Sequence, residues 1–89
     1  VSIIKPLILA SKRGNPEILA ATLQASGKGN INDFDDDGET PLYHSAKRGY
    51  CDCVKLLLDH GADMEIAEKY DKWTPLMVAA INGYEECTD

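Results

Sequence analysis

The sequence lacks any apolar run of about 18 residues, the minimum length with which a helix crosses a bilayer. It also lacks an excess of positive charge, because 9 Lys and Arg stand against 15 Asp and Glu, for a formal net charge of −6. Binding to nucleic-acid phosphates requires a dense basic face. The sequence therefore predicts neither membrane insertion nor nucleic-acid binding.

Cysteine is scarce as well, with three residues, Cys51, Cys53 and Cys87. Their odd number and spacing do not form a disulfide framework, and such thiols are usually reduced inside the cell. The chain starts without methionine, and Lys5-Pro6 interrupt its apolar beginning, unlike a signal peptide. We therefore expect an intracellular protein, cytoplasmic or nuclear, and a fragment of a larger one.

The sequence does contain an internal repeat. Thr40-Pro41-Leu42 recurs 34 residues later as Thr74-Pro75-Leu76. Other residues recur at the same offset: Ala46, Gly49, Tyr50 and Cys53 return as Ala80, Gly83, Tyr84 and Cys87. A weaker, earlier copy has Lys5-Pro6-Leu7 in place of Thr-Pro-Leu. A fixed period of this size indicates stacked repeat units.

Each unit has the start and stop signals of a helix hairpin. Thr40 and Thr74 are suited to cap a helix, and the proline after each fits the first helical position. Gly49 and Gly83 are suited to end these helices in a left-handed conformation. A second helix follows at once, with an apolar stripe over 53–58 in the middle unit.

The second helix of the first unit is predicted to start at Asn15, with Ile18, Leu19 and Leu23 facing inward. Small residues on the first helices allow close packing of neighbouring units. These are Ala10, Ser45, Ala46, Ala79 and Ala80. The polar stretches between units are expected to form projecting hairpins or loops.

The middle unit resembles one full ankyrin repeat. The resemblance rests on Gly38-Glu39-Thr40-Pro41-Leu42, Ala46, Gly49, Val54-Lys55-Leu56-Leu57-Leu58 and Gly61-Ala62-Asp63. It implies an all-α solenoid of stacked helix-turn-helix pairs with projecting β-hairpin or loop connections. Residues 1–89 would form a single domain, with repeats at about 5–37, 38–71 and 72–89, the last truncated. The family's usual histidine after Thr-Pro-Leu is replaced by Tyr43, Met77 and Ile8.

In ankyrin-like stacks the hairpin tips and first helices form a concave face that binds partners. The resemblance implies that the following residues lie there: Lys12, Arg13, Asp36, Asp37, Glu39, Lys47, Arg48, Lys72, Trp73, Ile81 and Asn82. Trp73 is the candidate hot spot, because tryptophan and arginine carry disproportionate binding energy at interfaces. The alternatives are that Trp73 packs on Tyr70 within its own loop and that the basic residues are only solvated.

One acidic stretch resembles part of a metal-binding loop. Asp33, Asp35, Asp37 and Gly38 match positions 1, 3, 5 and 6 of a calcium-binding EF-hand loop, but position 12 falls on His44. Calcium binding at 33–38 is therefore only a weak alternative.

Zinc binding by Cys51 and Cys53 with the two histidines is not expected, because two residues turn a helix by about 200° and the thiols face opposite ways. No constellation of acid, base and oxyanion donors is visible. The sequence predicts no metal, no cofactor and no catalytic residue.

The leading functional hypothesis is a module that binds another protein or peptide segment with acidic and apolar character. A second hypothesis is a structural spacer, or self-association through the uncovered last repeat, because exposed apolar repeat ends seek a cover.

Overall fold

The computed structural model describes residues 5–26 and 31–82. They form five α-helices: α1 Pro6–Arg13, α2 Pro16–Ser26, α3 Pro41–Arg48, α4 Cys51–Asp59 and α5 Pro75–Ile81. No strand occurs within these described ranges, which agrees with the predicted all-α class. Among the same residues, no helix is long and apolar enough to span a bilayer.

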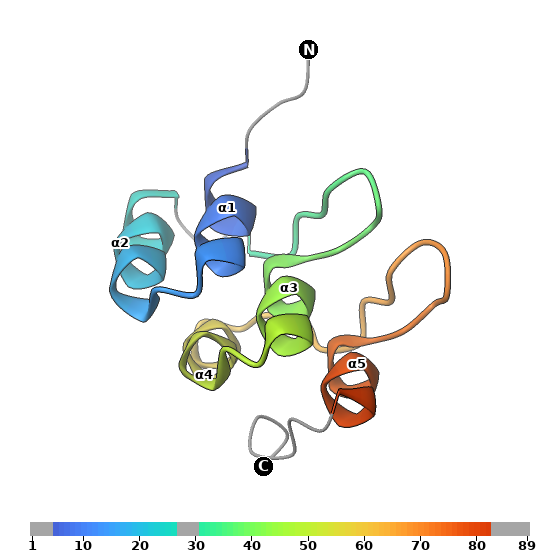
Figure 1. The fold of residues 1–89 in the computed structure, drawn as a ribbon. Coiled ribbons are helices and arrows are strands. Elements are labelled where there is room, and N and C mark those ends of the chain that lie inside the picture. The colour runs from blue at the N-terminus through green and yellow to red at the C-terminus, as the bar shows by residue number, and fades with distance from the viewer. Residues whose placement is uncertain (1–4, 27–30, 83–89) are drawn as a thin grey trace.

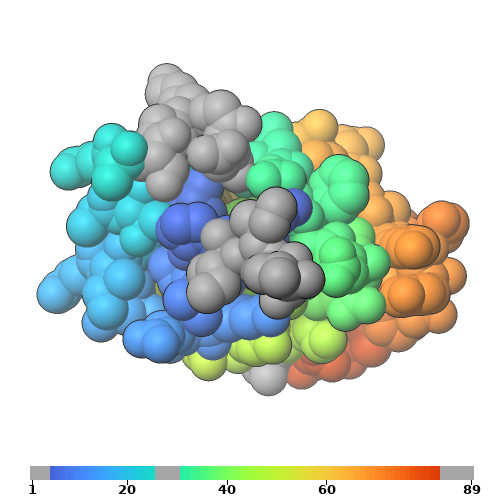
Figure 2. Space-filling view, turned by 90° about the horizontal axis from the view of Figure 1, so that it is seen from above, coloured from blue at the N-terminus to red at the C-terminus, as the bar shows by residue number. Residues whose placement is uncertain are grey.

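The helices stack in two layers. Helices α1, α3 and α5 lie in a row, with α2 and α4 in a second row beside them (Figure 1). Two loops project from one side of the first row, 31–39 before α3 and 62–73 before α5; we call them the first finger and the second finger. Seen from above, the repeats follow one another across the molecule in chain order (Figure 2).

The helix starts behave as the sequence predicts. The Thr40 hydroxyl accepts the backbone N–H of Tyr43 at 3.1 Å, and Thr74 accepts that of Met77 at 3.3 Å. Asn15 accepts the N–H groups of the first turn of α2. Gly49 ends α3 in the left-handed region, with φ of 78°. The predicted stop at Gly83 lies outside the described residues, and α5 ends at Ile81.

The core lies between the two rows of helices. Leu19, Cys53 and Leu57 have no exposed surface, and Leu23 is also buried. The prediction that Ile18 faces inward is wrong, since its side chain is 47% exposed. A helix turns by about 100° per residue, so Ile18 does not share the buried face of Leu19.

The two described cysteines differ. Cys53 is a free, fully buried thiol whose pKa is raised by burial and, to a lesser extent, by Asp52. Cys51 is partly buried and disulfide-bonded, so the expectation that it is reduced is wrong. The interpretation of Cys87 lies outside the described residues. Cysteine usage therefore gives less support to an intracellular location than the sequence suggested.

Candidate protein-interaction site

The first finger is closed by a single carboxylate. The backbone N–H of Asp35 donates to the Glu39 carbonyl at 3.2 Å, and the N–H of Gly38 donates to the Asp35 carbonyl at 2.9 Å. The Asp35 side chain accepts the N–H groups of Asp37 and Glu39, each at 3.0 Å. The Asp-rich stretch is therefore a hydrogen-bonded turn.

The second finger has the same plan with a glutamate. The Glu68 side chain is buried and accepts the N–H groups of Tyr70 at 2.8 Å, Asp71 at 2.6 Å and Trp73 at 3.1 Å. Burial opposes the charged form, but these N–H donors outweigh it and lower the pKa of Glu68. Lys72 takes the left-handed position of this turn, with φ of 61°.

The two fingers are in direct contact. The backbone N–H of Lys69 donates to the Asp37 carbonyl at 3.0 Å. Gly38 lies at this contact, and a Cβ on it would come within 2.8 Å of the Lys69 nitrogen. The short distance leaves room only for glycine at this contact between the two fingers.

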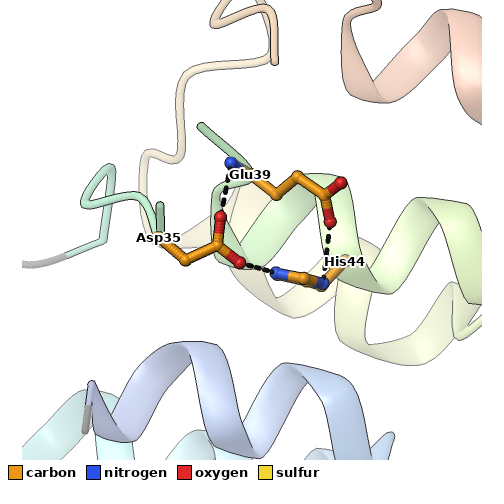
Figure 3. A group of neighbouring side chains, drawn as sticks. All are labelled: Asp35, Glu39 and His44. Atoms are coloured by element: carbon orange, nitrogen blue, oxygen red, sulfur yellow. Dashed lines mark hydrogen bonds and ion pairs between the residues drawn. The ribbon is translucent and has the colours of Figure 1, made fainter. Parts of the chain in front are cut away.

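His44 joins the first finger to α3 (Figure 3). Its Nε2 lies 2.8 Å from Asp35 Oδ2, and its Nδ1 lies 2.9 Å from Arg48 Nη1. A guanidinium can only donate, so Nδ1 accepts and Nε2 carries the proton that is donated to Asp35. Glu39 Oε1 lies 3.4 Å from the same Nδ1, and Glu39 Oε2 lies 3.7 Å from Lys47 Nζ.

The surroundings shift three pKa values in this network. Burial lowers the pKa of His44, and the hydrogen bond that His44 donates to Asp35 only partly opposes this. Burial raises the pKa of Glu39 and outweighs the attraction of Lys47. For Asp35, burial acts upward, but the Glu39 N–H and His44 outweigh it and lower the pKa. His44 is therefore neutral at pH 7, beside an ionised Asp35.

Asp35, Glu39 and His44 offer ligand atoms within 4.8 Å of one another, the spacing from which a metal site could be built. Both ring nitrogens of His44 are already used, however, and the positive Arg48 lies on Nδ1. In this structure the three side chains form an ion-pair network with Arg48 and Lys47. The calcium alternative gains no support either, because Asp33 pairs with Lys5 at 3.1 Å while Asp35 turns to His44.

Eight of the predicted interface residues are exposed, and five of these make no side-chain hydrogen bond or ion pair among the described residues. Lys12 and Arg13 lie at the end of α1, Asp36 and Asp37 at the tip of the first finger, and Ile81 on α5, with 58% of its surface exposed. The basic and acidic groups in this set have no side-chain ion pair among the described residues. They are available to a partner.

The other predicted residues make contacts within the chain. Arg48, Lys47 and Glu39 belong to the His44 network. Lys72 Nζ donates to the Lys69 carbonyl, and Asn82 Nδ2 donates to the Lys47 carbonyl at 3.0 Å.

Trp73 packs against the hydrophobic core and is partly buried, whereas Tyr70 is 67% exposed. The role of Trp73 as a binding hot spot stays a prediction.

Sequence reasoning missed the His44 network, and it expected an uncovered last repeat without naming the apolar side chains that are exposed there. Leu76 and Met77 on α5 are each 50% exposed, although their counterparts Leu42 and Tyr43 on α3 are buried. The available signal was the offset of 34 residues, which places 76 and 77 on the face that α3 turns to its neighbour.

An open hollow of about 500 Å³ lies between the fingers, with Phe34, Ile66, Ala67 and Lys69 in its lining. Phe34 is 54% exposed there, and Lys5 Nζ lies 5.6 Å from the centre of its ring. This aromatic side chain lies inside the Asp-rich stretch, between the carboxylates that suggested a calcium loop.

The repeat geometry agrees with the comparisons to known proteins. A family model described as ankyrin repeats (3 copies) matches residues 7–89. The chain belongs to the ankyrin repeat family. The human Notch-regulated ankyrin repeat-containing protein is 35% identical over 79 residues, which cover 86% of this chain and 68% of the relative.

Two other relatives are much longer than the match. The putative E3 ubiquitin-protein ligase XBAT34 of Arabidopsis thaliana is 43% identical over 81 residues, which cover 89% of this chain and 21% of that protein. The glycerophosphocholine phosphodiesterase GDE1 of Candida albicans is 35% identical over 79 residues, 88% of this chain and 7% of that protein. These similarities concern the repeats, which are typically non-catalytic interaction modules.

Proposed function

We propose that this ankyrin repeat chain binds an extended segment of another protein that presents acidic and apolar side chains. The observation that carries the proposal is a basic strip, Lys12, Arg13, Lys47 and Arg48, at matching positions of the adjacent helices α1 and α3. The strip stands out in a chain whose formal net charge is −6. It continues into the exposed Ile81 of α5.

Electrostatics and exposure support this reading. Lys12 and Arg13 are exposed, and Lys12 is close enough to His44 to lower its pKa, behind the effects of burial, Asp35 and Arg48. Cations from two helices therefore act on one region of the surface. Complementary charge favours binding of an acidic segment and speeds its association, and an apolar side chain is expected near Ile81.

The test uses a rhodamine-labelled peptide of alternating Asp and Leu, with binding followed by fluorescence anisotropy at low salt. Changing both Lys12 and Arg13 to Glu should weaken binding at least about tenfold, because two attractions become repulsions. The matched control is Lys55→Glu, a change at an exposed position of α4 on the other row. The double change alters the net charge by −4 and the control by −2, so a control that loses half as much binding free energy would show that only net charge matters and would remove the proposed face.

A second candidate function is self-association through α5. Leu76, Met77 and Ile81 are half or more exposed, and α5 carries no charged residue that would oppose contact with a second copy. We expect a concentration-dependent dimer in sedimentation equilibrium that Met77→Glu abolishes. Met64→Glu is the control, since Met64 is 45% exposed in the second finger, away from α5. A strictly monomeric chain at high concentration would exclude this candidate.

A further inference from the structure

Half of the basic strip is restrained by Glu39 of the first finger and by His44 of α3. Arg48 donates from Nη1 to His44 Nδ1 at 2.9 Å, and Lys47 Nζ lies 3.7 Å from Glu39 Oε2. Lys12 and Arg13, the other half, are exposed. The positive charge offered to a partner therefore depends on how firmly Glu39 and His44 hold their cations.

A second proton on His44 is incompatible with this arrangement. It would sit on Nδ1, the atom that accepts the Arg48 hydrogen bond, so that two donors and two positive charges would face each other across 2.9 Å. Arg48 would have to move away. The protonated Nδ1 would then face Glu39 Oε1, now 3.4 Å away, and draw this carboxylate from Lys47.

Protonation of Glu39 acts in the same direction. A neutral Glu39 no longer attracts Lys47, and burial already raises the pKa of this carboxyl group. Whichever of the two groups takes up the proton first, the positive charge of the strip increases.

The charged groups around His44 come from the first finger, from α3 itself and from α1. Asp35 and Glu39 face it from the first finger, Arg48 from α3 and Lys12 from α1. On α4 the charged residues Asp52, Lys55 and Asp59 are exposed, and α5 has no charged residue. Among residues 5–26 and 31–82, only the first finger supplies negative charge at the ring.

We propose that protonation of the His44–Glu39 pair releases Arg48 and Lys47 to the interaction face, so that the chain binds an acidic segment more tightly in mildly acidic solution. This regulation rests on the proposed function. It makes the first finger a proton-dependent restraint on the basic strip.

The binding test compares pH 7.5 with pH 5.5 at constant ionic strength, with the same Asp-Leu peptide, whose carboxylates stay ionised because their ordinary pKa is about 3.9. The wild-type chain should bind about three- to fivefold more tightly at pH 5.5, the effect of one or two exposed ion pairs. Constant or weaker binding at pH 5.5 would overturn the proposal while leaving the proposed function intact.

Variants identify the groups responsible. His44→Gln, checked for folding by circular dichroism, should bind equally at both pH values, because glutamine takes up no proton. Arg48→Gln should lose most of the gain in affinity between pH 7.5 and pH 5.5, even though His44 still titrates. Lys55→Gln, on α4, should keep this gain. If either His44→Gln or Arg48→Gln kept the full wild-type gain in affinity at pH 5.5, the mechanism would be contradicted.

NMR separates this proposal from the proposed function. In long-range ¹H–¹⁵N spectra the His44 ring should carry its proton on Nε2 at neutral pH, and the Arg48 side-chain N–H signals should shift with the His44 midpoint. Peptide that binds at neither pH would overturn the proposed function alone, because release of Arg48 is observed here without a partner. Arg48 signals that do not respond to His44 would overturn the release itself.

Discussion

Gly38 in the first finger and Lys72 in the second occupy equivalent positions, 34 residues apart, and have φ angles of 78° and 61°. Glycine tolerates this left-handed region of φ, whereas a lysine there is strained by its Cβ. The turn therefore imposes the left-handed conformation in both repeats, whatever side chain is present. Only the first finger has a residue adapted to it.

The same offset pairs His44 of α3 with Val78 of α5. Asp35 closes the first finger and also contacts α3 through His44, while Glu68 accepts only N–H groups of its own turn. The first finger is therefore coupled to a titrating side chain and to the basic strip. The second finger is closed without any such link.

The largest expected effect comes from Gly38→Ala, which should lower the free energy of unfolding by about 2–3 kcal/mol. The new Cβ would be strained by the positive φ and would meet the Lys69 nitrogen at 2.8 Å. Chemical denaturation measures the loss. Gly61→Ala is the matched control, because Gly61 has φ of 87° but nothing within 4 Å of an added Cβ. Equal losses would mean that the contact between fingers contributes nothing.

His44→Val gives α3 the residue type of α5 and should cost about 1–2 kcal/mol at pH 7, because Asp35 and Arg48 lose a hydrogen-bond partner. The pKa of His44 is lowered on folding, so its contribution to stability is present above about 6.5 and is lost as pH falls through the folded value. The variant should therefore show a flatter stability profile than the wild type between pH 7 and pH 5.5.

Glu39 acts in the opposite sense, because its raised pKa gives stability that is lost as pH rises. The wild type and His44→Val both retain Glu39. His60→Gln is the control for removing a histidine, because His60 bonds only the Leu56 carbonyl in its own helix. A profile that His44→Val leaves unchanged would show that folding does not shift the pKa of His44.

The sequence predicted the fold well, because the helix starts and the repeat period of an ankyrin stack depend on residues close together in the sequence. The Thr-Pro starts and the offset of 34 residues located α3 and α5, and the caps at Thr40 and Thr74 follow from a hydroxyl meeting free N–H groups. The interface was harder to predict. Whether Arg48 is solvated or bonded depends on His44, and the link from His44 to Asp35 spans nine residues with no periodic pattern.

Lys72→Gly should make the second finger resemble the first and raise the free energy of unfolding by about 0.5–1 kcal/mol. Relief of the left-handed strain exceeds the entropy that glycine gains in the unfolded chain. Thermal unfolding detects the gain. Lys69→Gly, at a position without positive φ, should instead lose stability. A loss in both variants would mean that the bond from Lys72 Nζ to the Lys69 carbonyl outweighs the strain.

The smallest effect is expected in α3, where Ser45 is fully buried and its hydroxyl has no hydrogen-bond partner among the described residues. The last repeat has Ala79 at this position, also buried, so Ser45→Ala should fit and raise the free energy of unfolding by about 0.5–1 kcal/mol. Ser11 of α1 is the control, since its buried hydroxyl donates to the Leu7 carbonyl at 2.8 Å and its loss should bring no gain. Denaturant midpoints decide between them. If both substitutions destabilise, Ser45 is satisfied by a buried water, and the two repeats differ less in their packing than their residues suggest.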